Sequence, residues 1–167
     1  QMAGEAISKM RLLRVDEDTT ANIGSIKAEG PTNIVPKIVE FSAEARSLSD
    51  QKLKEQSDHM VKCCQEAAEK FGGSVEVNVE TAYGAFKIAE DHPLVNVVKK
   101  ACGELGIPAE TTKSGGGSDT NIFNANGIEA INLGIGERKP HTLEEHLHIK
   151  DLENSARLAI EIIKQFA

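Results

Sequence analysis

The sequence has 167 residues, with 19 Lys and Arg against 26 Asp and Glu, and 40% of its residues are apolar. This length suits one domain or two small ones, and the composition excludes wholesale disorder. A net charge of −7, with five Phe, one Tyr and no Trp, argues against a nucleic-acid partner. No apolar run is long enough to span a membrane, so we expect no membrane partner.

The three cysteines favour a reducing compartment. Cys63 and Cys64 are adjacent and Cys102 stands alone, which is neither a disulfide framework nor a C-x-x-C pair. We expect a cytoplasmic protein whose cysteines are buried thiols.

The first half of the chain predicts five elements in the order helix, strand, strand, helix, strand: residues 2–13, 21–28, 37–46, 50–71 and 75–80. The helical segments carry apolar residues at helical spacing, whereas the second and third strands alternate apolar with polar residues. One further strand in front would complete β-α-β-β-α-β, the ferredoxin-like motif. We therefore predict an α+β, ferredoxin-like domain over residues 1–88 that lacks its first strand. The first helix has no capping residue, which suggests a chain cut from a longer one.

The second half alternates between helices and short apolar strands. A helix that Asp91 or His92 can cap precedes predicted strands at 109–113 and 128–133 and a final helix at about 150–166. This alternation is typical of α/β folds, in which helices cover a sheet. Two or three strands are too few for such a sheet, so we predict an incomplete α/β segment over residues 89–167.

Three consecutive glycines precede a short predicted helix. In Ser114-Gly115-Gly116-Gly117-Ser118-Asp119, backbone N–H groups are available to an anion or a carbonyl group. The spacing is not G-x-G-x-x-G and no Lys-Ser or Lys-Thr follows, so neither a dinucleotide site nor a Walker-type loop is indicated. The plainer alternative is a flexible turn in which Ser118 or Asp119 caps the helix.

Residues 139–148 contain three of the five histidines: His141, His146 and His148. Imidazole and carboxylate groups are ligands that zinc prefers. Thr142 and Glu145 also have the spacing of a helix capping box. The spacing alone leaves both interpretations open.

Asn33 and Arg46 are two further candidates. Asn33 lies between a Gly30-Pro31 turn and Pro36, where an Asn side chain commonly supports the turn itself. Arg46 shares the polar face of the strand at 37–46 with Glu44, with which it can form an ion pair. Each residue therefore has a structural alternative to a functional role.

Six short motifs, taken in order, resemble a known family. They are Thr20-Ala21-Asn22-Ile23-Gly24, Thr32-Asn33-Ile34-Val35-Pro36, Glu44-Ala45-Arg46-Ser47, Ser114-Gly115-Gly116-Gly117-Ser118-Asp119, Asn132-Leu133-Gly134 and His141-Thr142-x-Glu144-Glu145. The set resembles the peptidase T-like branch of the dizinc aminopeptidase/carboxypeptidase superfamily. The resemblance implies a catalytic α/β domain interrupted by a ferredoxin-like lid that also mediates dimerisation. Residues 1–88 would be the lid, and residues 89–167 the C-terminal segment of the catalytic domain.

The resemblance also implies residue roles. His141 matches the family's last metal ligand, and Asn33 matches an Asn that reaches the active site of the partner subunit. Arg46 matches an Arg that holds a substrate carboxylate. The loop along the substrate backbone is matched by Gly115, Gly116, Gly117 and Asp119. The implied cofactor is zinc, as two ions in the full-length enzyme, and the implied partners are a short peptide substrate and a second copy of the chain.

The rest of the family's site has no counterpart here. Its His-x-Asp pair, bridging carboxylate, further acidic ligand and catalytic Glu come from the N-terminal half of such enzymes, and these 167 residues contain no His-x-Asp. One ligand cannot hold a metal that needs about four. We therefore expect a full-length zinc-dependent aminopeptidase or tripeptidase that cleaves short peptides with a metal-activated water. We expect the chain alone to bind no zinc and to be inactive.

Two alternatives come from other classes of protein. One is a non-catalytic ferredoxin-like module for dimerisation or for binding a small ligand at the glycine loop. The other is a related amidohydrolase that acts on an N-acyl amino acid.

Overall fold

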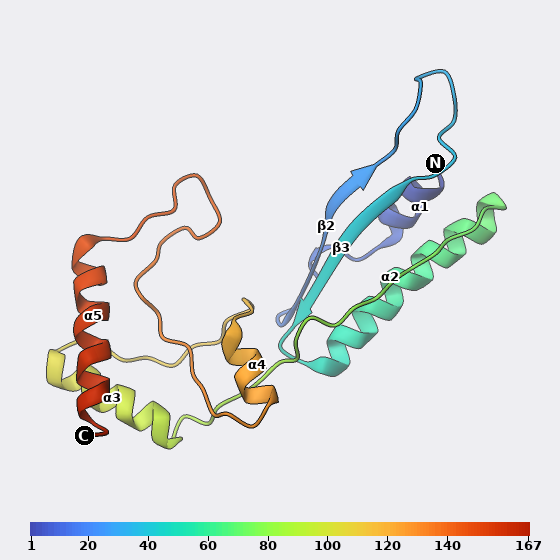
Figure 1. Ribbon diagram of the computed structural model, residues 1–167. Helices are drawn as coiled ribbons and strands as arrows, with labels where there is room; N and C mark the ends of the chain where they lie inside the picture. Colours follow the sequence, from blue (N-terminus) through green and yellow to red (C-terminus); the bar gives the residue numbers. More distant parts are fainter. The chain divides into compact units, whose positions relative to one another are not determined.

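The computed structural model describes residues 1–167, which divide into two compact units, Gln1–Ala85 and Phe86–Ala167 (Figure 1). The first unit contains α1 (Met2–Lys9), β1 (Leu13–Arg14), β2 (Thr19–Lys27), β3 (Glu40–Ser47) and α2 (Asp50–Phe71). The second contains α3 (Pro93–Leu105), α4 (Asp119–Ala125) and α5 (Ile149–Lys164). None of these helices has the length and apolar character that crossing a membrane requires.

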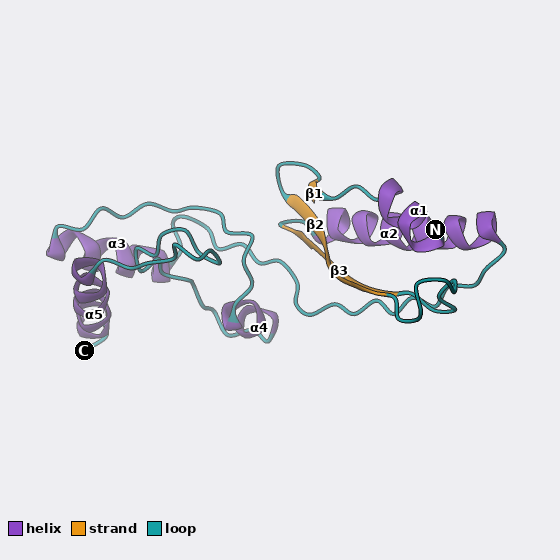
Figure 2. Cartoon of the chain, turned by 90° about the horizontal axis from the view of Figure 1, so that it is seen from above, coloured by secondary structure: helices purple, strands orange, loops and turns teal.

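The first unit is α+β, with a three-stranded antiparallel sheet in the order β1-β2-β3. β2 and β3 pair from Thr19–Ser47 to Lys27–Glu40, with one irregularity between Ile23 and Ser25. Both helices cover the same face of this sheet (Figure 2). The core between them is built from small and sulfur-containing side chains: Ala6, Met10, Ala21, Met60, Cys63, Cys64 and Ala67. Small residues at these positions let the helix backbones approach the sheet closely.

Helix α2 has a capping signal at each end, and its predicted bounds are confirmed. Ser49 accepts a hydrogen bond from the backbone N–H of Lys52, and Gly72 ends the helix in the left-handed conformation with φ 65°. The buried side of α2 includes Cys63 and Cys64, as expected for structural thiols. Burial raises the pKa of both thiols, which keeps them protonated and unreactive.

The first helix is shorter than predicted, because the chain turns back into a strand that the sequence pattern did not indicate. Two side chains of α2 bind the backbone of Arg11: its N–H donates to His59 Nε2 (3.2 Å) and its carbonyl accepts from Gln56 Nε2 (2.7 Å). These bonds replace the helical hydrogen bonds that Arg11 would make. Leu13 is therefore not a helix residue but part of β1, with a φ of 62° and 73% exposure.

The strand predicted at 75–80 is wrong for this chain. The residues between α2 and α3 form no ladder with another strand, and Val75, Val77 and Val79 are 40%, 41% and 59% exposed. In a β-α-β-β-α-β sheet the last strand lies beside the first, which is the strand that this chain is predicted to lack. β1 follows the first helix and pairs with β2, so it does not take that place. A strand needs a neighbour for its backbone groups, and this segment has none within the described residues. The chain thus forms three of the strands of an α+β unit, not a complete ferredoxin-like sheet.

The second unit is organised around the packing of α3 against α5. Its core consists of Ala101, Cys102 and Leu158, with partly buried apolar side chains around them. His92, one of the two predicted caps, accepts the N–H of Leu94 at Nδ1 (3.2 Å), and Gly106 ends α3 with φ 66°. Burial raises the pKa of the Cys102 thiol. The helices of the predicted α/β segment therefore form as expected.

The strands predicted at 109–113 and 128–133 do not form. Among residues 86–167, the one β-type pairing is an isolated bridge between Arg138 and His146, and the long connections are loops (Figure 2). Buried parallel strands are stabilised by strands on both sides, and no such neighbours exist in this unit. Ile128, Leu133 and Ile135 are accordingly exposed.

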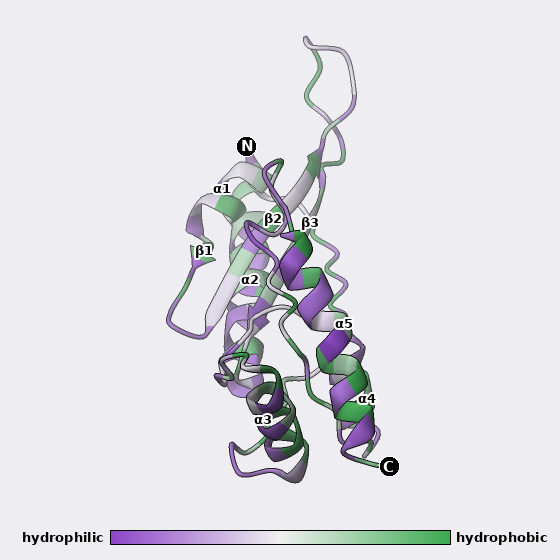
Figure 3. Cartoon of the chain, turned by 90° about the vertical axis from the view of Figure 1, so that its left-hand side faces the viewer, coloured by the Kyte–Doolittle hydropathy of each residue, from purple (hydrophilic) through white to green (hydrophobic).

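Helix α5 is amphipathic, and its apolar residues are largely uncovered. Hydrophobic and hydrophilic stretches share its surface (Figure 3). The exposed apolar side chains along it and at its end are Ile149, Leu152, Ile160, Ile163 and Phe166. A contiguous stripe of this kind is typical of a face that packs against other protein.

We predict that alanine substitutions at Gly72 and Gly4 change the stability of the first unit in opposite directions. Gly72→Ala places a Cβ on a residue with φ 65°, so we expect the free energy of unfolding of the first unit to fall by about 1 kcal/mol. Gly4 lies within α1 with nothing within 4 Å of an added Cβ, so Gly4→Ala is expected to raise it by about 0.5–1 kcal/mol. Urea unfolding of the two variants measures both changes. Equal effects would contradict the assigned backbone conformation at Gly72.

Candidate functional site

His141 lies in a loop closed at its base by the Arg138–His146 bridge. The N–H of each bridge residue donates to the carbonyl of the other, at 3.0 and 3.2 Å. Inside the loop, Thr142 Oγ1 donates to the carbonyl of Lys139 (2.8 Å) and accepts the N–H of Glu144 (3.2 Å). The predicted capping box does not form, because residues 142–145 make turns and not a helix.

The three histidines of this region have different environments. His146 donates from Nδ1 to the carbonyl of Glu144 (2.7 Å), and its ring meets the ring of His148 edge-on, with centroids 5.4 Å apart. His141 is exposed, and no hydrogen bond involves its imidazole. Of the three, His141 therefore has the ring that is most available to a metal ion or a substrate.

The donor groups of this chain do not fit a complete metal site. No group of three or more His, Cys, Asp or Glu side chains lies close enough together to hold an ion. A depression beside the loop has a volume of about 660 Å³ and is lined by Arg138, Leu147, His148 and the start of α5, without His141. His141 can thus supply one ligand, and any metal bound with it needs ligands from outside these residues.

The glycine loop is held at its exit by Asn132. Asn132 Oδ1 accepts from Ser118 Oγ (3.1 Å) and from Thr120 Oγ1 (2.6 Å). Ser118, not Asp119, caps α4, because its side chain accepts the N–H of Thr120 and Asn121 Oδ1 accepts the N–H of Ser118. The motif Asn132-Leu133-Gly134 indicates no role for Asn132; a polar residue inside the apolar run 128–133 is the signal that the sequence offers.

Neither backbone conformation nor crowding within the chain requires glycine at positions 115 and 116 of this loop. Gly115 and Gly116 do not have positive φ. A Cβ at Gly115 would meet nothing within 4 Å, and one at Gly116 would meet only Ser114 Oγ, at 3.5 Å. Absence of these side chains therefore leaves open surface, on which another molecule can approach the backbone closely.

Arg46 forms a two-point ion pair with Glu44 on the open face of the sheet. Arg46 Nε donates to Glu44 Oε1 (2.5 Å) and Nη2 donates to Oε2 (3.1 Å). The bond from Glu44 raises the pKa of the already basic Arg46. The ion pair predicted as a structural alternative is thus confirmed. The contact uses one edge of the guanidinium, so the Nη1–Nη2 end remains able to bind a second carboxylate.

Cross-strand neighbours extend this polar face. Thr20 lies opposite Arg46 and Asn22 opposite Glu44. A shallow depression of about 190 Å³ beside Glu44 is lined by Leu13, Thr20, Ala21 and Asn22. With side chains 42% and 62% exposed, Arg46 and Glu44 gain little stability from their pairing, so their arrangement is open to a binding role.

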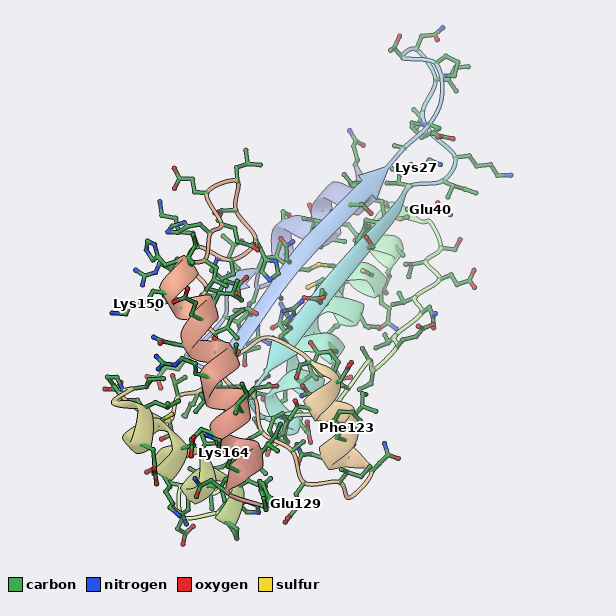
Figure 4. All side chains as sticks on the ribbon, turned by 60° about the vertical axis from the view of Figure 1, so that its left-hand side comes forward. Lys27, Glu40, Phe123, Glu129, Lys150 and Lys164 are labelled. Carbon is green, nitrogen blue, oxygen red and sulfur yellow. The ribbon has the colours of Figure 1, made fainter.

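Asn33 lies in a turn, as expected, within the loop of residues 28–39. The N–H of Ile34 donates to the carbonyl of Pro31 (3.1 Å), which places Asn33 at the third position of a four-residue turn. Beyond Lys27 and Glu40 this loop projects from the end of the sheet (Figure 4). Arg46 lies six positions along β3 from Glu40, about 20 Å away at the usual rise of a strand. The structure therefore does not bring Asn33 and Arg46 together.

The model of peptidase family M20/M25/M40 matches residues 4–165, almost the whole chain. The chain belongs to this family. It is 43% identical to a tripeptidase from Staphylococcus aureus subsp. aureus Mu50, with a TM-score of 0.89 over 98% of this chain and 44% of that one. It is 38% identical to the aminopeptidase PepT from Bacillus cereus ATCC 10987, with a TM-score of 0.82 over 97% and 43%. These matches place the M20 chain in the peptidase T-like branch.

Further M20-family relatives show how much of a protein the chain represents. It is 42% identical to the protein YqjE of Bacillus subtilis (strain 168), over 99% of this chain and 45% of YqjE. A succinyl-diaminopimelate desuccinylase of Acinetobacter baylyi is 26% identical over 88% of this chain and 38% of that protein. A dinuclear metal-binding peptidase from Bacillus subtilis shares the fold at 18% identity, with a TM-score of 0.71. The chain spans less than half the length of each.

We predict that replacing Asn132 by alanine reduces the order of the backbone around the glycine loop. Asn132→Ala leaves the hydroxyls of Ser118 and Thr120 without their shared acceptor, and Thr120 is buried. We expect about 1–3 kcal/mol less protection against amide exchange in α4, measured by hydrogen–deuterium exchange. Asn132→Asp keeps two acceptor oxygens and should retain most of the protection. Equal loss in both variants would contradict the assigned acceptor role.

Proposed function

We propose that this chain is the lid and the C-terminal part of the catalytic domain of a zinc-dependent aminopeptidase of the tripeptidase type. The observation that carries the proposal is the likeness to the Staphylococcus aureus tripeptidase along nearly the full chain. The open surface at Gly115 and Gly116 and the unbonded ring of His141 support it, because both leave groups available to a substrate or a metal.

In this proposal His141 is one zinc ligand, and the other ligands come from the part of the protein outside this chain. When bound, the metal polarises the carbonyl group of the peptide bond to be cleaved and activates a water molecule. This chain's own residues bind and orient the peptide: Gly115, Gly116, Gly117 and Asp119 lie along its backbone. The dinuclear metal-binding peptidase with the same fold is consistent with two ions in the complete protein.

Arg46 is proposed to recognise the free carboxylate of a short peptide. Glu44 uses Nε and one N–H of Nη2, which leaves Nη1 and the other N–H of Nη2 for a second acceptor. A peptide carboxylate can bind these N–H groups in the two-point geometry that arginine favours. Recognition of the terminal carboxylate would restrict the enzyme to peptides of limited length.

The first unit is proposed to form a homodimer, in which Asn33 contributes to the partner's active site. The loop of residues 28–39, which carries Asn33, projects from the sheet beyond Lys27 and Glu40 (Figure 4). Arg46 lies six positions farther along β3 than Glu40. A residue carried on such a loop is more accessible to a second copy than to the polar face of its own sheet. The cytoplasmic location stays a prediction from composition.

An amidohydrolase acting on N-acyl amino acids is the second candidate. The likeness to succinyl-diaminopimelate desuccinylase favours it, since that enzyme's name describes removal of an acyl group. A panel of tripeptides, dipeptides and N-succinyl amino acids separates the two activities in the complete protein. The peptidase proposal requires the highest kcat/KM for a peptide with a free amino terminus.

His141→Ala in the complete protein tests the proposed metal role. We expect zinc content to fall and kcat/KM for a tripeptide to drop more than about 100-fold, because a metal with an incomplete ligand set is bound weakly. Zinc is measured by elemental analysis after dialysis, and hydrolysis by release of the terminal amino acid.

His148→Ala is the matched control, since His148 lies in the same region and its ring contacts only His146. It should retain zinc and activity. The 167-residue chain alone should neither bind zinc stoichiometrically nor hydrolyse peptides. Unchanged activity in His141→Ala would refute the ligand assignment, and zinc-dependent hydrolysis by the chain alone would refute its proposed inactivity.

Arg46→Lys is expected to raise KM for a tripeptide about tenfold with little change in kcat, because lysine cannot make the two-point contact. The same tripeptide with an amidated carboxyl end serves as the control substrate, and its KM should hardly change. A KM increase of equal size for both substrates would show that Arg46 does not recognise the carboxylate.

A further inference from the structure

The backbone around His141 is strained. His141 has a φ of 63° and Lys139 a φ of 52°, and both are residues with side chains in the left-handed region. Side chains other than glycine rarely adopt this region. Lys139 also precedes Pro140, which restricts its backbone further. Such strain persists only where neighbouring contacts impose it.

One contact acts directly on the strained histidine. The backbone N–H of His141 donates to Glu145 Oε2 at 2.6 Å, a short bond to a charged acceptor. Glu145 is itself anchored, because its own N–H donates to the carbonyl of Thr142 (3.1 Å). The next residue, His146, forms the bridge that closes the loop. The carboxylate is thus fixed from its own backbone and points at the N–H of His141.

The neighbouring carboxylate does something different. The Glu144 side chain pairs with Lys139 Nζ and not with the backbone of His141. Both members of that pair are more than half exposed, and exposed pairs of this kind contribute little. The two adjacent glutamates therefore carry the same charge in the same loop, but only Glu145 binds the backbone of His141.

We propose that Glu145 is a positioning residue that holds His141 in the left-handed conformation and so fixes the direction of the Cα–Cβ bond that carries its imidazole. The direction of Cβ from the backbone depends on φ, so a return of His141 to an ordinary φ would swing the ring away from its present position. The ring makes no hydrogen bond of its own, so within this loop only the backbone restricts where it can reach, and its side-chain torsions stay free to adjust to a bound metal. This inference rests on the proposed role of His141 as a zinc ligand.

The test uses the metal affinity of the complete protein, measured by competition with a zinc chelator. Glu145→Ala is expected to weaken zinc binding about tenfold to 100-fold, the range seen when groups that orient a ligand are removed. Glu145→Gln keeps an acceptor oxygen without the charge and should recover most of the affinity. In the metal-free protein, exchange of the His141 amide with deuterium should be faster in Glu145→Ala than in Glu145→Gln.

Glu144→Ala is the matched control. It removes the same charge from the same loop, so it accounts for any general electrostatic effect on zinc, and its affinity should stay within about threefold of the unaltered protein. Thermal unfolding of each variant separates a change at the ligand from a loss of fold.

Three outcomes overturn the proposal. Glu145→Ala can bind zinc as tightly as the unaltered protein. Glu145→Gln can bind zinc as weakly as Glu145→Ala, which would show that Glu145 acts through its charge or as a direct zinc ligand and not through its hydrogen bond to His141. His141→Ala can leave zinc binding unchanged, which removes the proposed ligand itself. Loss of zinc in His141→Ala together with full affinity in Glu145→Ala rejects the positioning role alone and leaves the proposed function standing.

Discussion

The backbone groups of a strand must be paired, and this constraint decides which parts of the chain become regular structure. β2 and β3 are consecutive, antiparallel and joined by one loop, so each supplies the other's hydrogen bonds. β1 forms at the free edge of β2 because a short turn at Asp16–Asp18 brings it back, with Asp16 accepting the N–H of Asp18. Helices satisfy their backbone internally and need only a face to pack on. Every helix expected from the sequence therefore forms, whereas strands without neighbours do not.

In the second unit, hydrogen bonds from side chains stabilise backbone segments that strand pairing would stabilise in a sheet. Asn124 bonds to both the carbonyl and the N–H of Ala130, and Asn132 accepts from two hydroxyls around the glycine loop. In the same way, Glu145 binds the N–H of His141. These bonds satisfy backbone groups of loops that have no ladder partner. They also fix the loops that carry the candidate functional residues, so local order at the site does not require strands in this part of the chain.

The polar face of the sheet shows how an ion pair can leave a binding group available. Glu44 contacts Arg46 through two atoms, but it uses the side of the guanidinium that includes Nε. The orientation of the arginine is thereby restricted, and its side chain remains 42% exposed. Because both side chains are exposed, this pairing adds little to the stability of the fold. Under the proposed function, the pairing orients Arg46 on a paired strand toward a peptide carboxylate.

The sequence alone determined the helices, their caps and the family. Ser49, His92, Gly72 and Gly106 are local signals that act on their immediate neighbours, so their effect could be predicted without knowledge of the rest of the fold. The order of the short motifs was enough to indicate the peptidase T-like branch. Those motifs also contained the candidate site residues, although they gave no reason why Asn132 or Glu145 should matter.

Only the tertiary structure decided which strands exist and how the candidate site is held. The alternation at Val75–Val79 fits a strand, but pairing depends on a neighbour far away in the sequence, and none is present. Helix α1 ends early because side chains of α2 bind Arg11, a contact between residues 45 and 48 positions apart. The left-handed backbone of His141 follows from a loop closed between Arg138 and His146, which no local pattern revealed. Helix and turn propensities depend on neighbouring residues and can be predicted from the sequence. Strand pairing and backbone strain depend on residues that come into contact only after folding.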